Sequence, residues 1–157
     1  MTEAALIRPA RAADCPGVLR LWLDLIEYHR RFDPDYPAPP GIREVLRNEI
    51  ERGLRARGCR LGVADTGTEL VGFVFAEAKG GERRLHGEPG AGWIHELYVD
   101  PAQRRRGVAT ALLAFACEFF KARGGGRISV RVENGNEDGL QFWLQRGFAE
   151  RERILTR

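Results

Sequence analysis

Apolar residues in the first part of the chain recur at the spacing of α-helices. After Asp14 and Pro16, which suit the first turn of a helix, the pattern i, i+3, i+4, i+7 predicts one buried face made of Val18, Leu21, Trp22 and Leu25. A second helix that ends near Gly58 is predicted from a similar set, Ile42, Val45, Leu46, Ile50 and Leu54. Residues 32–41, between the two, include four prolines and predict an extended connection, because proline fixes φ and bars the preceding residue from helix.

The rest of the chain alternates between strand-like and helical patterns. Two β-rich runs, Arg60 to Ala64 and Leu70 to Ala76, surround a turn and predict an antiparallel hairpin. A glycine-rich stretch, 79–92, predicts a mobile surface loop that covers the site or merely connects two elements. Further strands are expected at Leu6 to Arg8, Trp93 to Val99, Ile128 to Val132 and Phe148 to Leu155, and further helices at Val108 to Ala122 and Asp138 to Arg146. This order predicts an α/β domain, a mixed sheet flanked by helices.

Composition narrows the class of protein. The chain has 157 residues, 43% of them apolar, which suits one domain with a continuous core. The net charge is only +3, so a nucleic-acid or membrane partner is not expected. The three cysteines are far apart, which predicts neither a disulfide framework nor a metal site, and no apolar run resembles a signal peptide or a bilayer span. We therefore expect a cytoplasmic protein.

Arginine accounts for 23 of the 25 basic residues, and three of them stand together as Arg104, Arg105 and Arg106. This run precedes a predicted helix, whose positive end disfavours cations. A bound anion would compensate, because Gly107, Val108 and Ala109 offer backbone N–H groups without intrahelical partners. The alternative is a solvated arginine run with a glycine turn.

Two segments resemble a known family. Residues 104–109, RRRGVA, match the R/Q-x-x-G-x-G/A motif of the GNAT N-acetyltransferase superfamily, between a strand and a long helix as in that family. Downstream, 136–148 resembles the family's N-x-x-A-x-x-F-Y-x-x-x-G-F segment. The resemblance implies one domain over 1–157, with a mostly antiparallel sheet of six to seven strands and about four helices. The resemblance leaves the oligomeric state open and allows a homodimer, since family members often pair through their last strands.

The resemblance implies acetyl-CoA as donor. Position by position, the backbone of Leu97, Tyr98 and Val99 would pair with the pantetheine arm, and Asn136 would bond that arm from the other side. The pyrophosphate would be held by the loop and helix start, which comprise Arg104, Arg105, Arg106, Gly107, Val108, Ala109 and Thr110. Judged from the residues alone, Asn136 is a helix cap.

Transfer to an amine calls for a base, which the family often takes from the strand before the phosphate loop. Here that strand carries His95 and Glu96, which strand alternation would place on opposite faces, so only one of them is expected to face the substrate. We favour Glu96. An ion pair for Glu96 and a structural hydrogen bond for His95 are the alternatives.

Trp143 is the departure from the family pattern. A Tyr is common there and protonates the leaving thiolate, whereas an indole N–H is not an acid near neutral pH. Trp143 is kept as a cofactor contact, and Phe142 is the better candidate for the core.

Acceptor residues are expected in the first helix and the connection after it. We select Tyr28, His29, Asp33 and Tyr36, acids and aromatics suited to a cationic amine of a small molecule or peptide. Three functions compete at this point. They are an N-acetyltransferase, a CoA-binding sensor without catalysis, which Trp143 would support, and a basic nucleic-acid binder, which we rank last.

Overall fold

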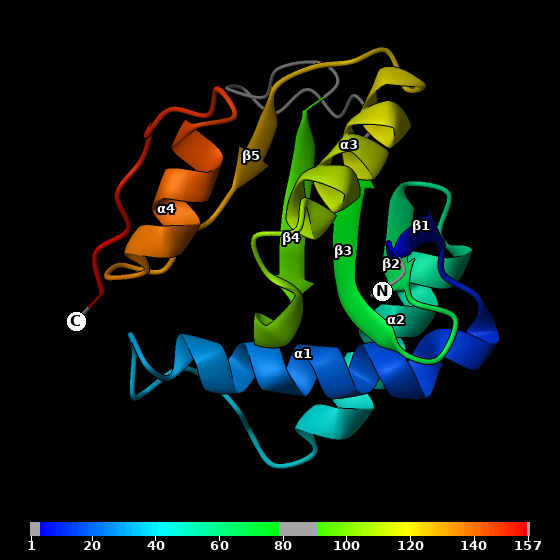
Figure 1. Ribbon diagram of the computed structural model, residues 1–157. Helices are drawn as coiled ribbons and strands as arrows, with labels where there is room; N and C mark the ends of the chain where they lie inside the picture. Colours follow the sequence, from blue (N-terminus) through cyan, green and yellow to red (C-terminus); the bar gives the residue numbers. More distant parts are fainter. Residues whose placement is uncertain (1–3, 79–90, 157) are drawn as a thin grey trace.

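The computed structural model describes residues 4–78 and 91–156, and Figure 1 shows these residues around one sheet. Within them the chain forms five strands, four α-helices and two short 3-10 helices. In chain order the strands and α-helices are β1 (Leu6–Pro9), α1 (Cys15–His29), α2 (Ile42–Arg55), β2 (Cys59–Asp65), β3 (Leu70–Ala78), β4 (Gly92–Val99), α3 (Val108–Lys121), β5 (Ile128–Val130) and α4 (Glu137–Leu144). Most of the predicted loop 79–92 lies outside the described residues.

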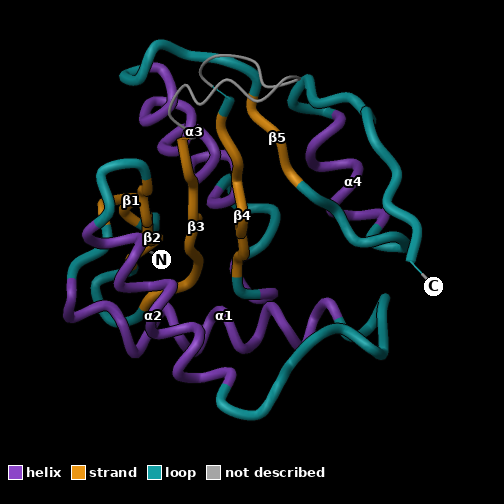
Figure 2. The backbone as a smooth tube through the Cα atoms, turned by 180° about the vertical axis from the view of Figure 1, so that it is seen from behind, coloured by secondary structure: helices purple, strands orange, loops and turns teal. Residues whose placement is uncertain are grey.

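The sheet has the order β1-β2-β3-β4-β5 and is mixed, as predicted. The first four strands pair antiparallel, whereas β4 and β5 are parallel. This last pairing involves only three residues of β4, Gly92, Trp93 and Ile94. Beyond them β5 leans away from β4, which both views of the backbone show (Figures 1 and 2). The second half of β4 therefore has a sheet neighbour on one side only among the described strands.

Helices cover the two faces of the sheet and divide the core in two. One apolar cluster joins α1 and α2 to β2 and β3, with Val18, Leu21 and Trp22 at most 6% exposed, as the helical spacing predicted. The other joins α3 to the opposite face, with Leu112 and Ala116 fully buried. In Figure 1, α3 crosses the central strands while α1 lies across their lower end. Each helix thus owes its place to its apolar stripe.

The predicted last strand, Phe148 to Leu155, is wrong, and the sheet has five strands among the described residues, where six or seven were expected. Figures 1 and 2 both show the chain after α4 running along the outer side of that helix, away from the sheet. Phe148 packs against the ring of Trp143, but Ile154 and Leu155 are 67% and 91% exposed. With α4 between it and β5, this segment finds no strand edge to pair with, whatever its β propensity.

Candidate active site

A β-bulge in β4 shapes the centre of the site. Phe75 of β3 pairs with Glu96, but the next residue, Ala76, pairs with Ile94, so His95 is the extra residue. A bulge breaks the strict alternation of side chains. His95 and Glu96 consequently both line one pocket, and the expectation that they point to opposite faces is wrong.

This pocket, the acceptor pocket below, has a volume of about 250 Å³. Its apolar part comes from α1, α2, the connection between them and β3, and its polar part from α2 and β4. The lining residues are Trp22, Ile26, Tyr36, Pro37, Ile42, Leu46, Glu49, Arg52, Phe75, His95 and Glu96. Such a mixture, apolar walls with a few convergent polar groups, is typical of small-molecule sites.

Glu96 is the perturbed acid of the acceptor pocket. Burial raises the pKa of its carboxyl to about 8, and the nearby negative charge of Glu133 acts in the same direction. Tyr36 stands within the same field, because burial and then the charges of Glu96, Glu133 and Asp33 raise its pKa to about 12. A carboxyl that titrates near neutral pH suits a general base in a cleft. Sequence reasoning missed Glu133, which follows β5 and approaches Glu96 only in the fold.

His95 contacts a chain of charged groups at the edge of the acceptor pocket. Its Nε2 lies 2.6 Å from Oε2 of Glu77 on β3. The other oxygen of Glu77 accepts a hydrogen bond from Nη1 of Arg52 at 3.1 Å, and Nη2 of Arg52 donates to Glu49 at 2.8 Å. No sequence pattern points to Glu77, because only the pairing of β3 with β4 brings it to His95.

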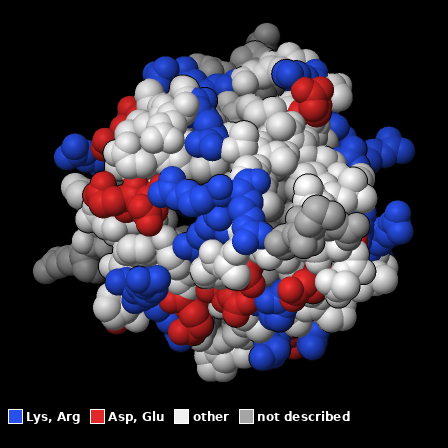
Figure 3. Space-filling view, viewed as in Figure 1, with Lys and Arg blue, Asp and Glu red and all other residues white. Residues whose placement is uncertain are grey.

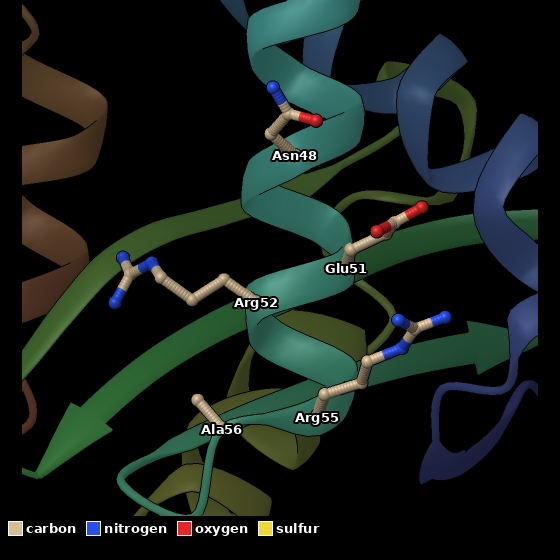
Figure 4. A pocket seen from close by; sticks show the side chains of 5 residues that line it. All are labelled: Asn48, Glu51, Arg52, Arg55 and Ala56. Atoms are coloured by element: carbon tan, nitrogen blue, oxygen red, sulfur yellow. The ribbon is translucent and has the colours of Figure 1, made fainter.

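A second hollow, of about 430 Å³, lies on the outer face of α2 and is lined by Asn48, Glu51, Arg52, Arg55 and Ala56. All five residues belong to one helix and its end. Figure 4 shows Arg52 directed to the opposite side of the helix from Glu51 and Arg55. The hollow includes neither His95 nor Glu96, so we place the chemistry in the acceptor pocket instead.

The loop between β4 and α3 has the backbone of an anion site. Arg105 has φ 61° and Gly107 φ 81°, and no atom lies within 4 Å of the position that a Gly107 Cβ would take. Turns of this kind aim successive N–H groups at one point, next to the first N–H groups of α3 at Val108 and Ala109. Figure 3 shows basic side chains gathered over the region where β4 ends and α3 begins. This loop, the phosphate loop below, therefore fits the pyrophosphate expected from the sequence.

The three loop arginines do not act alike. Arg104 turns away from the start of α3, because its Nε donates to the carbonyl of Val99 at 3.0 Å and its guanidinium lies 4.7 Å from the ring centre of Tyr28. Arg105 and Arg106 are exposed. We therefore expect Arg104 to contribute through its backbone and the other two through charge.

Arg146 joins the end of α4 to the start of α3, and sequence reasoning missed it. Nη2 of Arg146 donates to Oγ1 of Thr110 at 2.5 Å, and its guanidinium lies 3.8 Å from the ring centre of Phe142. Its Nε is buried without a hydrogen-bond partner. A fourth guanidinium thus lies beside the phosphate loop. Thr110, which is expected to contact the pyrophosphate, is also bonded to Arg146.

The second half of β4 and Asn136 are the parts expected to hold the pantetheine arm. Leu97, Tyr98 and Val99 lie beyond the last residues that pair with β5. Asn136 caps α4, because its Oδ1 accepts from the N–H of Gly139 at 3.0 Å, and the same oxygen accepts from the hydroxyl of Tyr28 at 3.2 Å. The helix-cap alternative is confirmed, and the side-chain amide nitrogen stays a candidate donor to a cofactor.

The predicted acceptor residues separate into two groups. Tyr36 lines the acceptor pocket. His29 stands behind it, with its ring stacked at 4.7 Å on that of Tyr36, and burial lowers its pKa. Tyr28 is turned toward Asn136, and Asp33 accepts a hydrogen bond from the backbone of Asp35. Of the four, only Tyr36 is among the residues that line the pocket.

Trp143 is 7% exposed and packs between the rings of Phe142 and Phe148, with 5.0 Å between ring centres in each case. Phe142 is the less buried of the pair. The expectation that Phe142 fits the core better than Trp143 is therefore wrong. Trp143 braces α4 from inside, and its contact with a cofactor stays a prediction.

Two curated proteins match parts of the chain in sequence. An uncharacterized N-acetyltransferase of Methanocaldococcus jannaschii is 41% identical over 59 residues, 38% of this chain and 26% of that protein. The streptothricin acetyltransferase of Streptomyces lavendulae is 27% identical over 81 residues, 52% of this chain and 39% of that protein. The matched segments thus span well under half of either relative.

Solved structures share the fold over nearly the whole chain. A tetramutant of the BH1408 protein from Bacillus halodurans superposes with a TM-score of 0.84 at 17% identity, over 97% of this chain and 98% of that one. The aminoglycoside N-acetyltransferase AAC(6')-Iy in complex with CoA superposes with a TM-score of 0.75 at 18% identity, over 97% of both chains. These likenesses establish the fold.

Across residues 4–78 and 91–156, no helix combines the length and apolar character needed to cross a bilayer, and no cluster of His, Cys, Asp and Glu has the geometry of a metal site. The model of the acetyltransferase (GNAT) family matches residues 22–148, which include the acceptor pocket, the phosphate loop and α4. The chain therefore belongs to the acetyltransferase (GNAT) family.

Proposed function

We propose that the protein is an N-acetyltransferase that transfers the acetyl group of acetyl-CoA to a primary amine of a small molecule or peptide. One observation carries the proposal. The bulge in β4 brings Glu96, an acid with a raised pKa, into the acceptor pocket, and the same strand leads directly to the phosphate loop. A single strand thereby connects a base to an anion site.

The residues expected to bind acetyl-CoA belong to the edge of β4 with Asn136 and to the phosphate loop. The backbone of Leu97 to Val99 and the amide of Asn136 would hold the pantetheine arm. The phosphate loop, Thr110 and Arg146 would hold the pyrophosphate by N–H groups and charge. Acetyl-CoA supplies a thioester whose carbonyl carbon accepts the amine, and the protein has to deliver that amine uncharged.

Glu96 lowers the free-energy cost of deprotonating the amine. A lysine-like amine has a pKa of about 10.4, so transfer of its proton to an ordinary Glu at about 4.3 costs about 8 kcal/mol. With the pKa of Glu96 at about 8, the same transfer costs about 3 kcal/mol. The remaining difference is within reach of an ordinary turnover rate. We therefore assign Glu96 as the proton acceptor, directly or through one water.

The walls of the acceptor pocket favour an amine with a compact apolar part. Trp22, Ile26, Leu46 and Phe75 are all at most 6% exposed and form its floor. A polyhydroxylated sugar would leave its hydroxyl groups unpaired against this surface. Arylalkyl amines and peptide termini with an apolar first residue are thus better candidates than the aminoglycosides acted on by some structural neighbours.

Two measurements test the proposal. Thermal unfolding with acetyl-CoA, CoA or ATP should show stabilisation by both CoA forms and none by ATP. Release of CoA thiol is then followed with arylalkyl amines, diamines, an aminoglycoside and short peptides, and we expect turnover with the first and last groups. Stabilisation without turnover for any amine would favour the CoA-binding sensor. No stabilisation by either CoA form would overturn both functions.

A further inference from the structure

The reaction proposed above has to release a proton to solvent. An ammonium substrate loses two protons when its nitrogen becomes an amide, and the departing thiolate takes one of them. The second proton must leave the site in every turnover. Glu96, which we assign as its first acceptor, is buried enough that its pKa lies near 8. Glu96 itself is only partly exposed, and His95, the residue before it in β4, is more exposed.

His95 can be the next acceptor of that proton. It adjoins Glu96 at the bulge, lines the same pocket, and its side chain is 34% exposed. Its Nε2 lies 2.6 Å from Oε2 of Glu77, and a carboxylate only accepts hydrogen bonds. Nε2 therefore carries the hydrogen, which leaves Nδ1 as the nitrogen that can accept a proton from the pocket.

Glu77 is itself held as a carboxylate. Burial raises its pKa, but the hydrogen bond from His95 and the charge of Arg52 outweigh burial and leave the pKa below its ordinary value. Both oxygens are engaged, one by His95 and one by Arg52. The ring of Phe75 lies beneath His95 at 5.6 Å and beneath the guanidinium of Arg52 at 5.0 Å. The orientation of His95 is thus fixed from two directions.

We propose that Glu77 is a positioning residue, which holds His95 in the tautomer whose Nδ1 passes to solvent the proton that Glu96 takes from the acceptor amine. The inference rests on the proposed function. The titratable and charged groups that face His95 are Glu77 on β3, Glu96 on β4, Glu49 and Arg52 on α2, and Tyr36 on the connection between the helices.

The step balances in protons. The ammonium N–H bond breaks as the carboxylate of Glu96 gains the proton. The carboxyl of Glu96 then loses it to Nδ1 of His95, directly or through a water. The imidazolium, stabilised by the negative charge of Glu77, returns it to bulk water. No electron transfer or further reactant is involved, and both side chains end each turnover as they began.

Kinetics of Glu77→Gln, His95→Ala and the double variant test the relay. We expect each single variant to lower kcat about tenfold with the KM for acetyl-CoA unchanged, and the double variant to match His95→Ala, because Glu77 acts through His95. Imidazole in the buffer should restore part of the turnover of His95→Ala. Glu51→Gln, which removes a carboxylate from the outer face of α2, is the matched control and should keep wild-type kinetics.

The outcomes separate the two proposals. Unchanged kcat in Glu77→Gln, or losses that multiply to about a hundredfold in the double variant, would overturn the relay while the acetyltransferase function stands. A wild-type protein that acetylates no amine would remove both. Nitrogen NMR of the imidazole, assigned with His95→Ala, adds a readout without turnover. We expect the Nε2–H tautomer in the wild type and a mixture in Glu77→Ala, and a dominant Nδ1–H tautomer would contradict the proposal.

Discussion

The acceptor pocket and the phosphate loop are neighbours along one strand but opposite in charge and in construction. The pocket has the carboxyl groups of Glu49 and Glu96 in its wall and Glu77 just behind His95. The loop has three consecutive arginines, with Arg146 beside it. The pocket thus suits a cationic reactant and the loop an anionic one. Strand β4 runs from one to the other, so the two regions are separate in charge but serve one reaction.

The largest effect is expected from the pocket. Glu96→Gln keeps the shape of the side chain and removes the proton acceptor, so kcat with an accepted amine should fall about a hundredfold, in the range that general bases contribute. The affinity for acetyl-CoA, measured by calorimetry, should not change, because the loop is untouched. Equal losses in affinity and turnover would show that the two regions are not separable.

The same substitution should change how stability depends on pH. Glu96 has a folded pKa of about 8 against an ordinary 4.5, so between these values the folded state binds more protons than the unfolded state. The free energy of unfolding of the wild type therefore falls as pH rises through this window, and that of Glu96→Gln does not. In urea unfolding, the free energy of unfolding of the variant should exceed that of the wild type by up to a few kcal/mol more at pH 8 than at pH 5. If both proteins respond to pH alike, the carboxyl is not perturbed.

Gly107→Val tests the loop alone. A β-branched residue at φ 81° is strained by about 1–2 kcal/mol and places methyl groups where phosphate oxygens are expected. We expect the Kd for acetyl-CoA to rise at least tenfold, with kcat at saturating acetyl-CoA within a few-fold of wild type. Gly124→Val is the matched control, since Gly124 also has positive φ, 96°, but lies beyond the far end of α3. Equal Kd values for the two variants would contradict the assignment of this loop as an anion site.

Trp143→Phe asks whether the helix behind both regions takes part in chemistry. Because the indole is packed among apolar rings and is no acid near neutral pH, turnover per folded molecule should fall less than tenfold. Thermal unfolding should show a lower Tm from the lost packing. A larger loss of turnover in a fully folded variant would assign Trp143 a direct part in the reaction.

The smallest effect is expected for Arg146→Ala. Loss of one partly exposed charge beside the phosphate loop should weaken acetyl-CoA binding by a few-fold, with more weakening at low salt than at high salt. Arg123→Ala provides the control. Arg123 stacks on Phe119 at 3.9 Å, four residues before it, as Arg146 does on Phe142, but at the opposite end of α3. A matching loss in both variants would mean that stacking, not phosphate recognition, is what the calorimeter detects.

The two regions also differ in how far the sequence alone could predict them. The phosphate loop is local, because the arginine run, Gly107 and the start of α3 follow one another, so periodicity and helix-end electrostatics located it together with the family resemblance. The four helices were likewise evident from apolar spacing. Such features need only neighbours along the chain.

The acceptor pocket depends on contacts between distant segments. The bulge that brings His95 and Glu96 into one pocket depends on the register of β3 against β4, which no pattern within β4 reveals. Glu77, Glu133 and Arg146 meet their partners only after the sheet forms. For the segment after Gly147 the local pattern predicted a strand that the fold does not contain. Its composition favours a strand, but α4 lies between it and the edge of the sheet.

The short pairing between β4 and β5 has a consequence for the order in which the molecule opens. Only three residues of β4 take part in that pairing. The other contacts of β5 and α4 with the rest of the molecule include the apolar packing of Trp143, the stacking of Arg131 on Trp93, and the bonds of Asn136 and Arg146 to Tyr28 and Thr110. This end of the molecule should therefore detach as a unit before the antiparallel strands do, and its amide hydrogens should exchange faster. A donor molecule bound between the diverging β4 and β5 would replace the strand contacts that are missing there. Binding would therefore complete the fold.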